Sequence, residues 1–157
     1  MTSSAQFQDQ AEALLRDGGS RVTRGRIAVL ACLLEASHAL THAEVEARLD
    51  PVLSMDRVTV YRILDWLTQQ GLAHRIAGDD RVWRFNAEVH AGHAGSHPHF
   101  QCNTCGDVVC LDEVAKVPSV ALPAGFKGEE TELTVRGVCA ACAPRRSGGR
   151  KGRSAQG

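Results

Sequence analysis

Two closely spaced cysteine pairs near the C-terminal end restrict what this chain can fold into more than any other feature. The first pair stands in CNTC at 102–105 and the second in CAAC at 139–142. Two residues between cysteines let both thiolates face one ion from a single turn, and two such pairs supply the four soft ligands of a closed tetrahedral zinc site. We therefore predict a structural zinc ion, on which folding of the small domain around it depends, held by Cys102, Cys105, Cys139 and Cys142.

A redox-active dithiol is the alternative interpretation of a CxxC pair. Such a dithiol typically opens a helix that follows a buried strand, whereas Gly106 and the strand-like run DVVC follow the first pair here. The N-terminus has no cationic start followed by an apolar stretch, and no run approaches the roughly 18 apolar residues of a membrane span. We therefore expect a cytoplasmic protein, in which paired cysteines favour metal binding or redox chemistry over structural disulfides.

Helical periodicity dominates the first half of the chain. Apolar residues recur at helical spacing in four segments, which are bounded by residues able to cap a helix or by glycines able to end one. Two short strand-like runs follow, separated by the turn signal GDD. Short helices followed by a tight hairpin predict a winged helix, in which one helix enters the DNA major groove and the hairpin touches the backbone. The expected helices cover 5–17, 24–36, 42–49 and 57–70, with caps at Thr23, Thr41 and either Ser54 or Asp56, and the expected strands cover 72–77 and 81–85.

The second half is expected to form a small, cysteine-rich α/β domain. Strand-like runs cover 99–102, 107–111 and 130–138, and a short helix is predicted around 112–117. The last fifteen residues carry five cations and no acid, which predicts a disordered basic tail, either simply solvated or a weak tether to DNA phosphates. The fold class is therefore α+β, divided into a winged-helix domain at 1–85, a hinge at 86–96, a metal-binding domain at 97–142 and the tail at 143–157.

Histidine density marks a second candidate site just before the first cysteine pair. Four of the seven histidines fall within ten residues, and the last two alternate on a strand-like stretch, so that both imidazoles can face one ion. Cys110 lies outside both CxxC pairs and is either a buried small hydrophobe or a thiolate ligand of a second metal ion. The four clustered histidines are His90, His93, His97 and His99.

Three runs of the sequence together resemble the ferric uptake regulator family: HPHFQCNTCGDVV, GVCAAC and VTVYRILDWLTQQGLAHRI. A histidine pair just ahead of CxxCG, with a second CxxC near the end, is rarely shared by chance, and the TVYR motif is independent support. The resemblance covers residues 10 to 142. It implies a homodimer with an N-terminal winged helix and a C-terminal dimerisation domain, closed into its DNA-binding form by a metal ion near the hinge.

The resemblance also implies roles for single residues. The CxxC cysteines match the structural zinc site, and the two histidines just before them match histidines of the regulatory site. Cys110 stands where members place a carboxylate ligand, and His74 matches a histidine ligand of zinc-sensing members, although alone it would more often be a surface or packing residue. Asn86 stands where members commonly place Glu, Asp or Cys, so another residue must take that role. The implied regulatory ligands are His74, His97, His99 and Cys110, with His90 and His93 as candidates for the missing one.

Recognition of DNA is the second function that the resemblance implies. An arginine can fork onto guanine O6 and N7, and a tyrosine can contact a thymine methyl group; Arg57 and Thr59 are better placed for phosphates. The formal net charge of zero does not by itself favour nucleic-acid binding. The predicted DNA-binding residues are Arg57, Thr59, Tyr61 and Arg62.

Ligand softness decides which metal we expect at the second site. Imidazoles with one thiolate suit Zn²⁺, whereas iron and manganese sensors rely on carboxylates and histidine. We therefore predict a zinc uptake regulator and not an enzyme: a homodimeric repressor with structural and regulatory zinc that binds double-stranded operator DNA, with no membrane or small organic substrate as partner. The alternatives are an iron- or peroxide-responsive regulator of the same family, a CxxC thiol oxidoreductase and a zinc-ribbon interaction module. A zinc hydrolase is disfavoured because no motif such as HExxH is present.

Overall fold

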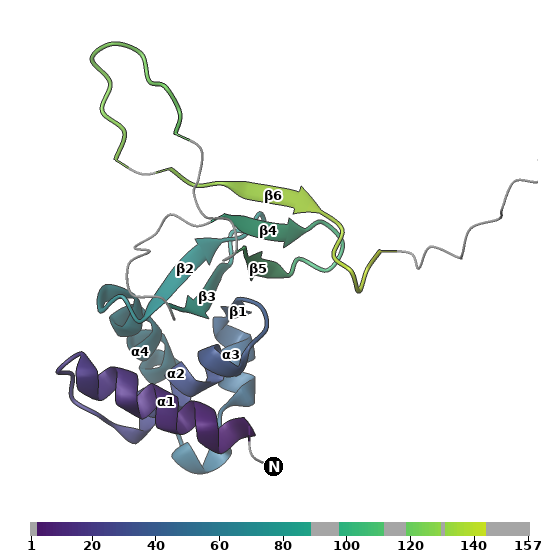
Figure 1. Cartoon of the computed structure of the whole chain (residues 1–157). Helices are drawn as coiled ribbons and strands as arrows, with labels where there is room; N and C mark the ends of the chain where they lie inside the picture. The colour runs from purple at the N-terminus through teal and green to yellow at the C-terminus, as the bar shows by residue number, and fades with distance from the viewer. Residues whose placement is uncertain (1–2, 89–97, 112–118, 130, 144–157) are drawn as a thin grey trace, which may run out of the picture.

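A computed structural model describes residues 3–88, 98–111, 119–129 and 131–143 (Figure 1). Its helices are α1 (Ser3–Asp17), α2 (Arg24–Glu35), α3 (His42–Arg48) and α4 (Arg57–Gln69), with a 3-10 turn, η1, at Pro51–Leu53. Its strands are β1 (Leu40–Thr41), β2 (Ala73–Ala77), β3 (Trp83–Ala87), β4 (His99–Cys102), β5 (Val108–Cys110) and β6 (Thr134–Gly137). No helix in these described ranges is long and apolar enough to cross a membrane.

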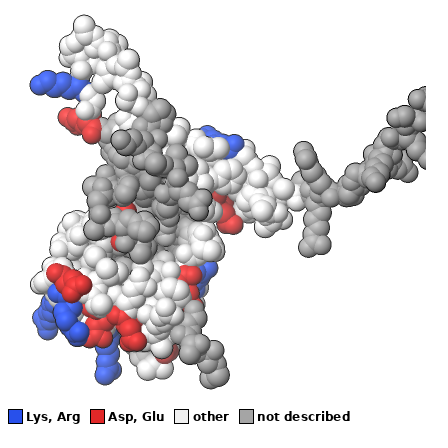
Figure 2. Space-filling model, viewed as in Figure 1, with Lys and Arg blue, Asp and Glu red and all other residues white. Residues whose placement is uncertain are grey.

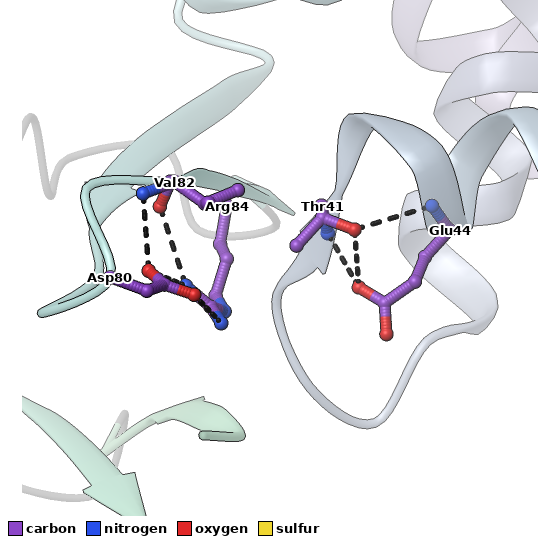
Figure 3. A network of polar contacts seen from close by, with 5 residues as sticks. All are labelled: Thr41, Glu44, Asp80, Val82 and Arg84. Atoms are coloured by element: carbon purple, nitrogen blue, oxygen red, sulfur yellow. Dashed lines mark hydrogen bonds and ion pairs between the residues drawn. The ribbon is translucent and has the colours of Figure 1, made fainter. Parts of the chain in front are cut away.

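Side-chain caps explain where the helices of the first half begin. Thr23 accepts a hydrogen bond from the backbone N–H of Arg26, two residues into α2. Thr41 and Glu44 form a reciprocal capping box at α3, in which each side chain satisfies the backbone N–H of the other residue (Figure 3). Asp56, and not Ser54, caps α4, and both Thr caps are confirmed.

The first half forms the predicted winged helix around one hydrophobic core. The three strands of its sheet lie in the order β1-β3-β2, and both pairs are antiparallel. Strand β1 was not predicted, because two residues are too short to show a period. Buried side chains from α1, α2, α3, α4 and the sheet fill the core; the largest of those that are fully buried are Leu15, Leu30, Leu33, Leu40, Leu64 and Leu67.

The second sheet is small and carries a long connection. Its strands lie in the order β5-β4-β6, with β4 antiparallel to β5 and parallel to β6. The strand expected over 130–138 is shorter, and the helix expected around 112–117 lies outside the described residues, as do tail residues 144–157. The described residues between β5 and β6 project away from the body of the molecule (Figure 1) and expose Val120, Leu122 and Phe126.

The two halves meet where the hairpin of the winged helix contacts the second sheet. The backbone N–H of Ala39 donates to the carbonyl of Val108 at 2.8 Å, and both side chains pack with Ile76 in a small apolar cluster. Strand β3 runs on to Ala87, and the N–H of Glu88 donates to Leu72, so the start of the expected hinge at 86–96 belongs to the hairpin. Residues 89–97 lie outside the described part of the chain.

Candidate metal centres and DNA-binding surface

The two CxxC pairs meet at one end of the second sheet, where we call them the cysteine cluster (Cys102, Cys105, Cys139 and Cys142). Cys102 ends β4 and pairs in register with Gly137 on β6, which brings the second pair beside the first. The four sulfur atoms all lie within 4.8 Å of one another, and the Sγ atoms of Cys105 and Cys139 are 3.7 Å apart. Four thiolates at about 2.3 Å from a zinc ion would be about 3.8 Å apart. The cluster therefore has the spacing of one tetrahedral metal site.

Backbone donors favour a thiolate in this cluster. The N–H groups of Cys105 and Cys139 point at Cys102, and these hydrogen bonds lower the pKa of its thiol to about 6. The pKa of Cys142 is raised, chiefly by the neighbouring Cys139 thiol. Because like charges at this spacing oppose further ionisation, four thiolates can coexist here only around a cation. The donor chemistry therefore fits a divalent metal ion.

A second group of donors, which we call the junction cluster, consists of His74, His99 and Cys110. His99 and Cys110 face each other across the β4–β5 pair, and His74 reaches them from β2 of the hairpin. The Nε2 atom of His74 lies 3.4 Å from Nε2 of His99 and 3.4 Å from Sγ of Cys110. Donors bound tetrahedrally to zinc would be about 3.3 to 3.6 Å apart. The three atoms thus converge from two sheets on one point with the spacing of a metal site.

Two further residues lie beside the junction cluster: Asn86, which the sequence reasoning set aside as a ligand, and Glu88, which it missed. The Oε2 atom of Glu88 lies 2.9 Å from Nδ1 of His74, and the amide of Asn86 donates to Sγ of Cys110 at 2.9 Å. Asn86 pairs directly with His74 across the hairpin, and Glu88 is the diagonal neighbour on the same face. The hairpin register, once known, is the signal that would have found both residues.

Of the six histidine and cysteine ligands expected at the regulatory site, the structure brings three together. His74, His99 and Cys110 form the junction cluster. The other three lie outside the described residues: His90, His93 and His97.

The residues expected to contact DNA lie on the first half of α4. Arg57, Tyr61 and Arg62 are exposed, whereas Thr59 is half-buried and its N–H is held by Asp56. An open groove of about 480 Å³ separates this part of α4 from the hairpin, whose Arg81 and Trp83 line its other side. The groove therefore has cations on both walls, and Arg81 is a candidate that the sequence reasoning missed.

A charge network shapes the turn of the hairpin. Both carboxylate oxygens of Asp80 accept hydrogen bonds from Arg84, at 3.0 and 2.9 Å (Figure 3). These bonds, with one from the N–H of Val82, lower the pKa of Asp80 to about 2.

On the face seen in Figure 2, charges of both signs interleave over the helical half, with no broad patch of one sign. On this face, contacts to a polyanion would therefore come from local groups and not from a broad cationic patch.

Comparisons with known proteins agree with this architecture. A model of the ferric uptake regulator family matches residues 17–136. Ferric uptake regulation protein 1 of Mycolicibacterium fortuitum is 34% identical over 123 residues, which cover 76% of this chain and 74% of that protein. The transcriptional regulator FurA of Mycobacterium tuberculosis is 34% identical over 141 residues, which cover 85% of this chain and 90% of that protein.

A solved structure shares the fold. It is a zinc uptake regulator complexed with zinc and DNA, with a TM-score of 0.63 and 23% identity, covering 90% of this chain and 96% of that one. At this identity the likeness speaks for the fold: a winged helix followed by a small C-terminal domain. The family match spans most of the chain, and relatives of similar length are transcriptional regulators. The chain therefore belongs to the ferric uptake regulator family of metal-responsive transcriptional regulators.

Proposed function

We propose that this chain is a zinc-responsive repressor, which binds operator DNA as a homodimer when zinc occupies the junction cluster. The observation that carries the proposal is the convergence of His74, His99 and Cys110 at the spacing of tetrahedral ligands. Two imidazoles and a thiolate suit zinc better than iron or manganese, which favour carboxylates. The cysteine cluster, with four sulfur donors, is assigned to a structural zinc ion.

The placement of the junction cluster supports a regulatory role for it. His74 belongs to the hairpin of the winged helix, whereas His99 and Cys110 belong to the second sheet. A metal ion held by residues from both halves binds more tightly when the hairpin is docked on the second sheet than when it is not. The ion therefore stabilises the docked arrangement. Zinc concentration would thereby set the fraction of molecules whose winged helix is held in one orientation.

We assign operator contacts to the first half of α4 and to the hairpin. Arg57, Tyr61 and Arg62 are exposed on α4, and Thr59 lies at its first turn. His42 holds this end of the helix, since its Nε2 lies 3.0 Å from the carbonyl oxygen of Arg57. The zinc uptake regulator that shares the fold is complexed with zinc and DNA, which supports DNA binding by this chain.

The experiment uses a duplex selected from a random library by the zinc-loaded protein. We expect zinc to tighten binding to this duplex at buffered free concentrations below those at which Fe²⁺ does so. Cys110→Ser should raise the zinc concentration required, because it replaces the thiolate by a weaker ligand, while the zinc of the cysteine cluster is retained. Co²⁺ placed in the junction cluster should show thiolate-to-metal absorption that the variant lacks.

Cys32→Ala is the matched control, since Cys32 is buried in the helical core and belongs to neither cluster. It should leave both the zinc response and the Co²⁺ spectrum unchanged. If duplex affinity does not change when metal is removed from the junction cluster alone, the proposal is wrong.

An iron-responsive regulator is the second candidate. Ferric uptake regulation protein 1, at 34% identity, favours it, and so does the carboxylate of Glu88 beside His74. Activation of duplex binding by Fe²⁺ at lower free concentrations than zinc, unaffected by Cys110→Ser, would establish this alternative.

A further inference from the structure

Two neighbouring aspartates at the tip of the hairpin form ion pairs with arginines from different parts of the molecule. Asp80 is paired with Arg84, which belongs to the same hairpin. Asp79 is paired with Arg136 of strand β6, with Nη2 and Oδ1 2.6 Å apart. The second ion pair therefore exists only while the hairpin is docked on the second sheet.

The pair between Asp79 and Arg136 is part of a wider contact. Arg84 lies beside Gly106, where its Nη2 is 3.5 Å from the place that a Cβ atom would occupy. Its charge interacts with Asp107, the next residue of the same turn. With the hydrogen bond from Ala39 to Val108, these contacts hold the hairpin against β5 and the first cysteine knuckle. These contacts position the turn, so that Asp79 lies within reach of Arg136.

The charge of the turn depends on Arg136. Asp79, Asp80, Arg81 and Arg84 together carry two negative and two positive charges, a sum of zero. Arg136 raises this sum to +1. Asp79 is two residues from Arg81, so that their Cα atoms are at most about 7 Å apart, a distance comparable to the screening length of about 8 Å at physiological salt. A phosphate drawn to Arg81 would therefore also experience the charge of Asp79.

We propose that Arg136 is a positioning residue for DNA binding, which cancels the charge of Asp79 so that the hairpin can approach phosphates. When the hairpin leaves the second sheet, Asp79 is uncovered and repels the DNA backbone. Docking of the two sheets is thereby coupled to the electrostatics of the hairpin turn. The inference rests on the DNA-binding surface proposed above.

A double-mutant cycle tests this coupling with the native protein, Arg136→Ala, Asp79→Asn and the double variant. All four are saturated with zinc and titrated into the selected duplex and into a random-sequence duplex. We expect Arg136→Ala to weaken both by about fivefold, the upper range for one exposed charge pair. Asp79→Asn should bind no more weakly than the native protein, and the double variant should bind like Asp79→Asn. The defect should also shrink at high salt, because screening shortens the range of the repulsion.

Three outcomes would overturn the inference. Arg136→Ala could leave affinity unchanged, or it could weaken binding equally in the Asp79→Asn background, which would make Arg136 a direct DNA or dimer contact. Failure of the native protein to bind either duplex would overturn both this inference and the proposed function. Arg136→Lys, which keeps the charge, should bind like the native protein; zinc content and sedimentation confirm that each variant is folded and assembled alike.

Discussion

The imidazole of His74 lies between Glu88 on one side and the other two members of the junction cluster on the other. Glu88 can therefore determine which ring nitrogen of His74 binds the metal ion. Its carboxylate faces Nδ1 at 2.9 Å, while Nε2 faces His99 and Cys110. A neutral imidazole that ligates through Nε2 carries its proton on Nδ1, where a carboxylate accepts it. We therefore expect Glu88 to favour the tautomer and the orientation of His74 that the proposed site needs.

Glu88→Gln should lower the zinc affinity of the junction cluster by about 10- to 100-fold, the usual cost of losing such a partner. Competition with a chromophoric chelator measures the affinity, after the cysteine cluster has been filled. Glu129→Gln, in the exposed connection before β6, is the matched control and should have no effect. Unchanged affinity would contradict the assigned role, whereas an altered Co²⁺ spectrum would make Glu88 itself a ligand.

In the hairpin turn, the backbone of Gly78 packs closely against the ion pair of Asp80 and Arg84. Gly78 is buried, and a Cβ atom added there would lie 2.1 Å from Nη1 of Arg84 and 2.5 Å from Oδ1 of Asp80. Both atoms belong to the ion pair that closes the turn. Only a residue without a side chain leaves room for that pair.

Gly78→Ala should destabilise the protein by about 1–3 kcal/mol, the usual cost of overpacking, because the methyl group displaces Arg84 from Asp80. Urea unfolding of the metal-loaded protein measures the change. Gly18→Ala, at the end of α1, is the control, since its added methyl group would meet neighbouring atoms at no less than 3.5 Å. Equal stability of the two variants would mean that the turn rearranges freely.

Local signals predict the elements of the winged helix because each signal acts within one turn of chain. Thr41 and Asp56 cap α3 and α4 through bonds to residues three positions ahead. Strand β1 has no such signal, because its two residues become a strand only by pairing with Arg84 and Phe85, more than forty positions away. The hairpin likewise extends past its expected end at residue 85 because Glu88 bonds to Leu72.

The candidate metal ligands were predictable where residue type and spacing alone indicate a metal donor. The four cysteines and His99 are recognisable by type and spacing alone. Glu88 is not, because its place beside the junction cluster follows from the register that sets His74 opposite Asn86; the position of Asn86 at the site came from the family resemblance and not from its donor chemistry. Pairing between distant strands, and not residue type, determines which polar groups surround the ligands.

At the scale of the whole molecule, the two halves differ in what holds them together. Among the residues that the structure describes, the main core contains fifteen buried ones, all between Ala11 and Ala87. The second cluster contains three, Ala39, Ile76 and Val108, of which only Val108 comes from the second sheet. Cys102 and Pro98 are the other fully buried side chains described near this sheet. At about 1.5–3 kcal/mol for each large apolar side chain, this burial is too little to order three strands against the loss of chain entropy.

We therefore expect the cysteine cluster to contribute much of the stability of the second sheet, since structural zinc binding contributes about 10–16 kcal/mol to small metal domains. Cys139→Ser should abolish ordered β4, β5 and β6 while α1, α2 and α4 stay folded, because their core includes nothing from the cluster. Hydrogen exchange followed by NMR measures this, with protection lost in the strands and kept in the helices. Ala140→Ser, between the two ligands, should leave both halves protected. Loss of protection in the helices as well would mean that the two halves fold as one cooperative unit, joined through the contacts of Arg84 and Ala39 with the second half.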